Sequence, residues 1–384
     1  MLPPWRRRES PLEDIPSPEP ARSAAKGGAM GIAIGTEYHD PHYVTGRMRD
    51  GIVARALGRP PSEALRPYYY STWAQLADAC CATGVNPKTN PGRAVELALQ
   101  TTSDFPLLLG DGFRQIALER YANAQVTHRR IAVPRLFSNF RPHRVVRAGD
   151  FPALLEVGEH AEYQSGAMGE SGETLTLATY GRTLGVTRRV LVDDNIAAFA
   201  DLATAAGLRA ADFENATFFV RCILPGSGLG PNLADGVAVY DAVAHGNVAG
   251  AGALDLVRLG DARARLKAQA TPDGVRLNLN AAILLVSPDS QTLAEQLVAQ
   301  LAPGQASGGR ITPIADANLT GTRFYVLAEP AQLSNYATGY LEGAAGLRVE
   351  ARSGFDFDGV QIRVSLDFAC GAVESRAGVT GAGA

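Results

Sequence analysis

The sequence predicts an α+β protein, and three stretches of its 384 residues carry that prediction. Apolar side chains recur at alternating spacings of three and four through residues 194–222, which is typical of one long amphipathic helix. Residues 360–368 alternate apolar and polar side chains with a period of two, which indicates a half-buried strand. Residues 282–286 are a short, wholly apolar run that predicts a buried strand inside a mixed module.

Composition excludes several classes of protein. Apolar residues make up 46% and charged residues 20%, so a packed core is expected rather than a disordered chain. The formal net charge is −3, so the chain lacks the excess of positive charge that is typical of a general nucleic-acid binder. No run approaches the ~18 apolar residues of a membrane helix, and residues 1–20 lack the apolar core of a signal peptide. Four scattered cysteines are expected to be reduced thiols, as in a cytosolic assembly site.

The first hundred residues are predicted to hold only short elements. Residues 1–44 are rich in proline and poor in apolar side chains, which is typical of a tail. Residues 48–57 and 71–82 carry helical patterns, and residues 90–92 (Asn-Pro-Gly) read as a turn that closes the segment. The two helices have little surface to bury against each other, so we expect them to need a partner surface.

The long helix has a clear start and end in the sequence. Asp193, Asp194 or Asn195 can cap it, and the Leu-Pro-Gly run at 224–226 ends it after roughly 40 Å. Its expected buried face is rich in alanine and includes Phe213 and Val220. An earlier helix is expected to start at residue 103 or 104 and to bury apolar side chains as far as residue 121.

Residues 225–345 are predicted to form a mixed module of helices and strands. Its expected elements are a glycine-rich loop at 226–236, a helix at 254–268, a strand at 282–286, a helix from 287 to 301, and strands at 311–314, 322–328 and 336–341. A terminal hairpin is expected to join strands at 347–351 and 360–368 through Asp358-Gly359. Residues 377–384 read as a tail of small residues.

Charge is unevenly distributed in the middle of the chain. Residues 120–149 contain seven arginines and no acid, whereas residues 150–173 contain six acids and neither lysine nor arginine. The acidic stretch has a tip rich in serine and glycine and leads into an alternating strand at 174–180. We take both blocks as interface candidates, with these residues as the candidate contacts: Glu156, Glu159, Glu162, Glu170, Glu173, Arg129, Arg130, Arg135, Arg141, Arg144 and Arg147.

The residues of an enzyme are not grouped in any recognisable pattern. Cys80 or Cys81 is a candidate nucleophile, but each is more simply explained as part of a buried helix face. The glycine-rich loop at 226–230 follows a helix rather than a strand, which argues against a nucleotide site. The histidines at 39–42 offer at most three ligands around a proline, which is a poor metal site. We therefore predict no catalytic residues, no metal and no cofactor.

Several separated blocks resemble one family. They are residues 101–106 (TTSDFP), 229–236 (LGPNLADG), 245–247 (HGN), 319–325 (LTGTRFY) and the terminal 358–368 (DGV through DF). In order and spacing, residues 101–376 resemble the major capsid protein of tailed bacteriophages with the Hong Kong 97-type fold. The similarity is specifically to the capsid part of prohead protease–capsid fusion proteins.

The resemblance implies a domain division and a role. Residues 1–100 would be an N-terminal arm or scaffold-like extension, 151–177 the E-loop, and 225–345 the A domain. Residues 101–150, 178–224 and 346–376 would form the P domain with its long spine helix, followed by the tail at 377–384. The implied function is that of a major capsid protein, a shell subunit that self-assembles into hexamers and pentamers around packaged double-stranded DNA. The implied location is the virion, with assembly in the host cytoplasm.

Two departures from the family change what is expected. The protease domain of the fusions is missing, so processing would need a separate prohead protease, beside portal and decoration proteins as further partners. The acidic stretch holds no lysine, so a lysine–asparagine crosslink from the E-loop is not expected. The resemblance leaves open whether residues 1–100 are removed on maturation.

Two other functions remain open from the sequence. An encapsulin-like nanocompartment shell would share the fold but enclose protein rather than DNA. A soluble cysteine-dependent hydrolase would use Cys80 or Cys81 and would not assemble. From the charge pattern we further expect the acidic E-loop of one subunit to lie on the basic 120–149 segment of its neighbour. The alternatives are that each block is solvated, that the two pair within one chain, or that the basic block faces DNA phosphates.

Overall fold

The computed structural model of the protein describes residues 41–100, 104–146, 172–301, 311–354 and 357–383. All of them lie in one unit of the chain, residues 39–384. Their strands form a five-stranded, a four-stranded and a two-stranded sheet, and helices pack on the two larger ones. The predicted mixture of helices and sheets is confirmed.

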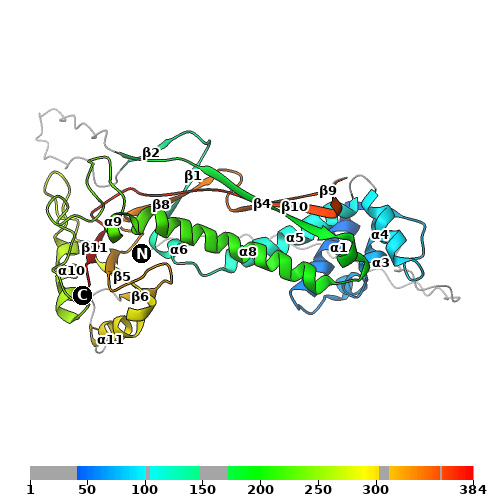
Figure 1. Cartoon of the computed structure of the whole chain (residues 1–384), viewed down its shortest axis with the longest axis horizontal. Coiled ribbons are helices and arrows are strands. Elements are labelled where there is room, and N and C mark those ends of the chain that lie inside the picture. The colour runs from blue at the N-terminus through cyan, green and yellow to red at the C-terminus, as the bar shows by residue number, and fades with distance from the viewer. Residues whose placement is uncertain (1–40, 101–103, 147–171, 302–310, 355–356, 384) are drawn as a thin grey trace, which may run out of the picture. The chain divides into compact units, whose positions relative to one another are not determined.

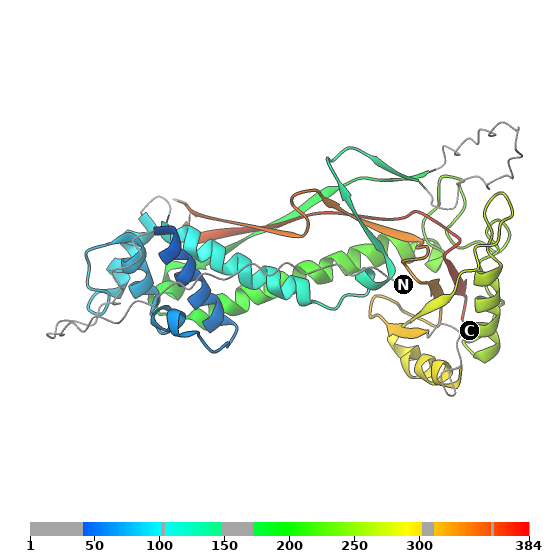
Figure 2. The same ribbon diagram turned by 180° about the vertical axis from the view of Figure 1, so that it is seen from behind.

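A pair of long helices runs beside the five-stranded sheet. Helix α5 (Asp104–Asn123) packs against α8 (Ile196–Phe218), which continues as one π-helical turn at Phe219–Ile223 (Figures 1 and 2). The side chain of Asn195 caps α8 by accepting a hydrogen bond from the amide of Ala198, at 3.0 Å. The predicted long helix is therefore confirmed, and Asn195 is the capping residue among the three candidates.

The buried face of α8 agrees with the prediction in its first half, where Ile196, Phe199 and Ala203 are buried, and differs from it farther along the helix. Phe213 and Val220 are 38% and 62% exposed, whereas small residues such as Gly207 and Ala211 are buried. The reason is the close approach of α5, because a Cβ atom at position 207 would overlap the carbonyl oxygen of Ala117. Small side chains at the crossing let the two backbones touch, and this rotates the bulkier stripe away from α5.

Two glycine-to-alanine substitutions, one at this crossing and one in another helix, are expected to change the free energy of unfolding in opposite directions. Gly207→Ala is expected to lower the free energy of unfolding by about 1–3 kcal/mol, because the added methyl group must push α5 away. Gly260 lies inside helix α10 (Leu256–Ala268) with nothing within 4 Å of an added Cβ. Gly260→Ala is therefore expected to raise the same free energy by about 0.5–1 kcal/mol through helix propensity alone. Thermal unfolding of the two variants checks both signs, and a stabilised Gly207→Ala protein would contradict the tight crossing.

The N-terminal helices find their partner surface in the same chain. They are α1 (Pro41–Ala56), α2 (Arg66–Tyr69), α3 (Trp73–Cys81) and α4 (Pro91–Gln100), with a short 3-10 turn at Glu63–Leu65. Helix α1 packs on α5 and α8, and α3 and α4 pack on α5 and on α7 (Arg188–Val192). The expected partner surface is thus provided by α5, α7 and α8 of the same chain. Residues 41–100 pack on these helices and do not form an extended arm.

One turn prediction in this region is wrong. Asn90-Pro91-Gly92 does not close the segment but opens helix α4, which begins at Pro91. The amide of Ala94 donates to the carbonyl of Asn90, at 3.2 Å, as in a first helical turn. Proline fits the first turn of a helix because its missing N–H would have no helical partner there. The Asn-Pro-Gly sequence at 90–92 therefore begins a helix rather than forming a turn.

The five-stranded sheet joins parts of the chain that lie far apart in sequence. Its strand order is β1 (Val133–Phe137), β8 (Tyr336–Leu341), β10 (Phe357–Ala372) and β4 (Ala178–Thr187), with β9 (Leu347–Gly354) also paired to β10. Strands β9 and β10 are antiparallel, so the predicted pairing of the two terminal strands is confirmed. The predicted turn is wrong, because Asp358 and Gly359 lie inside β10 rather than between the strands. Helix α5 packs on β9 and α8 on β10, which buries the apolar side of the hairpin.

The four-stranded sheet is the centre of the module that the sequence predicts after residue 225. Its order is β11 (Gly378–Gly381), β7 (Phe324–Ala328), β5 (Ala281–Val286) and β6 (Thr312–Ala315). Helices α10 and α11 (Gln291–Leu301) pack on it over a core that includes Leu284, Val326 and Leu266. Short turns at α9 (Pro225–Gly228) and η4 (Pro288–Ser290) precede the sheet and α11.

The predicted C-terminal tail is wrong for its described residues, because they form the edge strand β11. Val379 is fully buried, and β11 pairs antiparallel with β7. The hydroxyl of Thr380 donates to the carbonyl of Phe324, at 3.0 Å. A Cβ atom at Gly381 would overlap the Phe324 ring, so small residues are needed for the strand to pass beneath that ring. The glycine and alanine content reflects close packing rather than a loose end.

Candidate assembly interface

The basic and acidic blocks meet at the base of one hairpin. From helix α6 (His128–Ile131) the chain passes through β1 into β2 (His143–Val146), which pairs antiparallel with β3 (Gly172–Leu175). In this register Arg144 lies opposite Thr174 and Val145 lies opposite Glu173, so the Arg144 and Glu173 side chains project from opposite faces of the strand pair. The predicted strand at 174–180 is divided between β3 and β4. The geometry places Glu173, at the C-terminal end of the acidic stretch, next to the basic segment.

The structure describes only part of the candidate set. Glu156, Glu159, Glu162, Glu170 and Arg147 lie outside the described residues. The remaining acid, Glu173, bonds within its own chain, because its Oε1 atom accepts a hydrogen bond from the amide of Ala234, at 2.9 Å. This contact ties β3 to the loop that follows α9.

Four candidate arginines are exposed on the basic segment. They are Arg130, Arg135, Arg141 and Arg144, and none forms an ion pair with an acid in the part of the chain that the structure describes. Two large apolar side chains lie among them, Leu136 with 62% and Phe140 with 47% of its surface exposed. Exposed apolar side chains between arginines are typical of a protein interface. We call these six exposed residues the basic strip.

Arg129 behaves differently from the other arginines. Its guanidinium donates to the carbonyl of Tyr121, at 2.9 Å, lies 4.5 Å from the centre of the Tyr121 ring, and reaches Glu214 at 3.4 Å. These contacts use its donors inside the chain. Arg129 therefore supports the subunit rather than the basic strip.

A buried polar network lies beneath the strip and was not predicted. The carboxylate of Glu214, fully buried on α8, accepts a hydrogen bond from the Tyr121 hydroxyl at 2.5 Å. The Nε2 atom of His128, also fully buried, lies 3.5 Å from the same carboxylate. Burial, followed by the negative charge of Glu214, raises the pKa of Tyr121 and keeps its hydroxyl protonated. The available signal was a glutamate on the same helical face as Ala211 and Phe218.

The network continues into the C-terminal module. The Asn215 side chain accepts from the amide of His128, at 3.0 Å, and donates to Asp316, at 2.8 Å. Burial of Asp316 acts to raise the pKa of its carboxyl group. Hydrogen bonds from Thr127, Asn215 and Asn318 outweigh burial and hold that pKa below its usual value. The long helix, the start of the basic segment and the module are thus tied together by polar contacts that are shielded from water.

In the part of the chain that the structure describes, the candidate residues of an enzyme are not brought together. The hydrogen bond to Cys81, then burial, raises the pKa of the Cys80 thiol, which is the opposite of what a thiolate nucleophile needs. Within the described ranges no group of three or more His, Cys, Asp or Glu side chains could hold a metal ion. The described helices include none with the length and apolar content to span a membrane.

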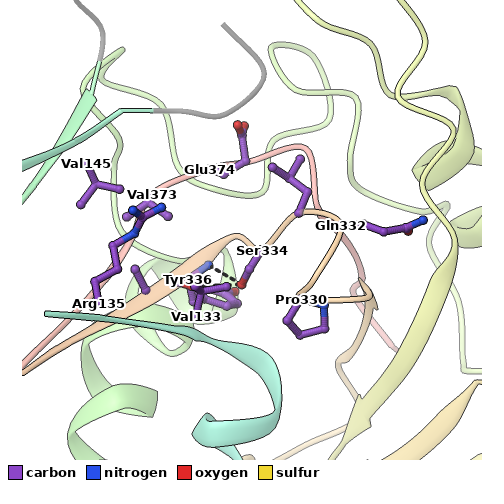
Figure 3. Close-up of a pocket in the computed structure, with 11 residues that line it drawn as sticks. Val133, Arg135, Val145, Pro330, Gln332, Ser334, Tyr336, Val373 and Glu374 are labelled. Atoms are coloured by element: carbon purple, nitrogen blue, oxygen red, sulfur yellow. Dashed lines mark hydrogen bonds between the residues drawn. The ribbon is translucent and has the colours of Figure 1, made fainter. Parts of the chain in front are cut away.

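A shallow groove of about 190 Å³ lies beside the basic strip. Figure 3 shows Arg135, Val145 and Val373 on one side of it and Pro330 on the other. Glu374, also in the lining, is paired with Arg376 at 2.6 Å. Burial acts to raise the pKa of Glu374, but the side-chain hydrogen bond from Arg376, the charge of Arg376 and backbone hydrogen bonds together outweigh it and lower that pKa. The groove is mostly apolar, and its arginine, Arg135, forms no ion pair with a described acid. Such a lining is suited to binding another protein surface rather than to catalysis.

Solved structures with a similar arrangement come from viruses and from protein shells. A chain of Microbacterium phage Oxtober96 is 12% identical with a TM-score of 0.41, over 68% of this chain and 89% of that chain. The capsid of an empty GTA particle is 16% identical with a TM-score of 0.44, over 67% and 90%. The SrpI encapsulin of Synechococcus elongatus PCC 7942 is 12% identical with a TM-score of 0.41, over 69% and 94%.

The family comparison is specific. No curated protein matches the chain, but the family described as phage capsid protein matches residues 172–381, more than half of its length. The match runs from β3 through β11 and so includes α8, the module and the terminal hairpin. It confirms the resemblance to phage capsid proteins and does not bear on fusion to a protease. The chain belongs to the phage capsid protein family and is a structural subunit of a capsid shell.

Proposed function

We propose that the chain is the major shell subunit, which associates with its own copies as hexamers and pentamers and encloses double-stranded DNA. The family match is the observation that supports a capsid role most directly. The exposed arginines and apolar side chains of the basic strip support association, since nothing in the described part of the chain covers them. Assembly would take place in the host cytoplasm, with a separate protease, portal and decoration proteins as further partners.

The domain division follows from the same proposal. Residues 151–177 would be the E-loop, since β2 and β3 form a narrow base on either side of the acidic excursion. The five-stranded sheet with α5 and α8 would be the P domain, because α5 packs on α8 and on β9, and α8 packs on β10. The four-stranded sheet with α10 and α11 would be the A domain. The polar network around Asn215 would then join P and A domains within each subunit.

Charge supports one specific contact between copies. The acidic excursion carries Glu156 and Glu159 with neither lysine nor arginine of its own, and the basic strip carries arginines that no described acid neutralises. Complementary charge steers association and fixes register. We therefore propose that the acidic excursion of one copy lies on the basic strip of its neighbour.

Charge reversal tests this contact. The double variant Arg135→Glu, Arg144→Glu is expected to lower the yield of sedimenting shells about tenfold, because like charges then face each other. Adding Glu156→Arg and Glu159→Arg to the same chain is expected to recover most of that yield. Arg209→Glu is the matched control, since Arg209 is highly exposed and paired only with Asp212 on its own helix, at 3.7 Å. Shells formed at the normal yield by the double variant would exclude the contact.

Electron microscopy of the expressed chain separates the candidate functions. Closed particles that contain nucleic acid are expected. Closed particles that contain an enzyme and no nucleic acid would favour the nanocompartment. A single 40.5 kDa species whose catalytic activity is lost in Cys80→Ser would favour the hydrolase.

A further inference from the structure

Residues 41–100 form a helical lobe, made of α1 to α4, that lies outside the matched family range of 172–381. The lobe has fully buried side chains of its own, among them Met48, Trp73 and Leu76. Helix α3 begins with a complete capping box, in which Thr72 and Gln75 each bond the other's backbone amide. These are features of a folded, integral part of the subunit.

The lobe shares its core with the two long helices. The ring of Trp73 lies edge to face against Phe199 of α8, with centroids 5.3 Å apart. The ring of Phe113 on α5 lies on Phe199 as well, with centroids 5.8 Å apart. All three side chains are almost fully buried. Removing the lobe would expose Phe113 and Phe199 to water, and each buried aromatic side chain of this size contributes strongly to stability.

A single carboxylate joins the lobe to the start of α8. Asp194 accepts a hydrogen bond from the amide of Trp73 at 2.8 Å, which caps α3, and its other oxygen lies 3.7 Å from Arg55 of α1. Its φ of 51° is in the left-handed region, which is unfavourable for most residues and tolerated by Asp and Asn. The turn between α7 and α8 therefore adopts a strained conformation that puts this carboxylate against the lobe.

We infer that the helical lobe is a permanent part of the assembled subunit, docked through Asp194 and Trp73, and that maturation makes no cut that removes residues 41–100. This goes beyond the proposed shell function, and it settles a question that the family resemblance leaves open. Asp194 acts as a positioning residue that fixes the lobe on the long helices. A second ion pair, between Arg59 of the lobe and Glu119 of α5, supports the same attachment.

A designed cut tests whether the lobe stays in place. A recognition sequence for a site-specific protease is inserted after Lys88, in the exposed connection between α3 and α4. After cleavage of the purified protein, the two fragments are expected to elute together and to separate only in denaturant. Release of the N-terminal fragment in native buffer would overturn the inference. This result does not depend on assembly, so it stands apart from the test of the proposed function.

Variants at the attachment point sharpen the result. Asp194→Ala in the cut protein is expected to raise the rate of fragment release about five- to tenfold, as for loss of a helix cap and an ion pair. Asp194→Asn is expected to restore slow release, because its amide oxygen can accept from Trp73 and asparagine tolerates the same φ. Asp193→Ala is the matched control, since Asp193 pairs only with Arg189 on its own helix. Equal release from the Asp193 and Asp194 variants would exclude the positioning role.

The mass of the subunit in finished particles gives an independent measurement. Intact-protein mass spectrometry of shells is expected to show a chain that retains residues 41–100. A subunit that begins within or after those residues would overturn the inference, even if the insertion after Lys88 prevents folding.

Discussion

Glu214→Ala is expected to lower the free energy of unfolding by about 3–5 kcal/mol, the usual cost of removing one member of a buried charged pair. The substitution leaves the Tyr121 hydroxyl and the Arg129 guanidinium without their shared acceptor, and it removes the carboxylate 3.5 Å from the buried His128 ring. Within the described residues the ring nitrogens of His128 have no hydrogen-bond partner. Calorimetry of the unassembled subunit measures the effect as a lowered transition temperature.

Glu350→Ala is the control for that experiment. Glu350 also pairs with arginines, Arg348 and Arg363, but its side chain is 46% exposed on the sheet. Exposed ion pairs contribute about 0–1 kcal/mol, so this variant should unfold close to the wild-type temperature. Similar losses from Glu214→Ala and Glu350→Ala would show that the network is not the polar centre of the subunit.

Trp73→Ala is expected to lower the free energy of unfolding by a comparable amount, about 3–5 kcal/mol, through the cavity it leaves between the helical lobe and α8. The side chain is fully buried, and its Nε1 atom has no hydrogen-bond partner in the part of the chain that is described. Trp73→Phe removes that orphaned N–H and keeps an aromatic ring against Phe199, so its loss should be smaller. Urea unfolding followed by circular dichroism compares the variants.

Tyr70→Ala serves as the matched control, because Tyr70 belongs to the same lobe and is 73% exposed. Its effect is expected to fall within about 0.5 kcal/mol of the wild type. If Trp73→Ala were as mild as Tyr70→Ala, the shared core between the lobe and the long helices would be ruled out.

Local patterns predicted most elements of this fold. Strand β8 has the same bounds, Tyr336–Leu341, as the strand that the sequence predicts there. The existence of α8 follows from its period, but its orientation does not, because Gly207 and Ala117 meet only after two distant segments pack. The strand β11 was missed for the same reason, since the ring of Phe324 that requires glycines beneath it comes from another strand.

The candidate site was predicted less completely than the fold. Charge blocks can be read directly from sequence, so the exposed arginines of the basic strip were found. The partners of Glu214 could not be, because Tyr121 lies 93 positions away and nothing local connects them. The contacts of Arg129 within its own chain could not be predicted either, because they depend on that same long-range packing.

Strand β10 has a mechanical consequence for a container under internal pressure. Its 16 residues pair with β4 along Gly359–Phe368 and with β8 along Phe368–Ala372, without a break in the chain. Tension applied along this strand loads many hydrogen bonds in shear at the same time, whereas peeling would break them one after another. Strand β10 thus stiffens each subunit along its length. Under excess internal pressure we expect the contacts between subunits to break before any single subunit unfolds.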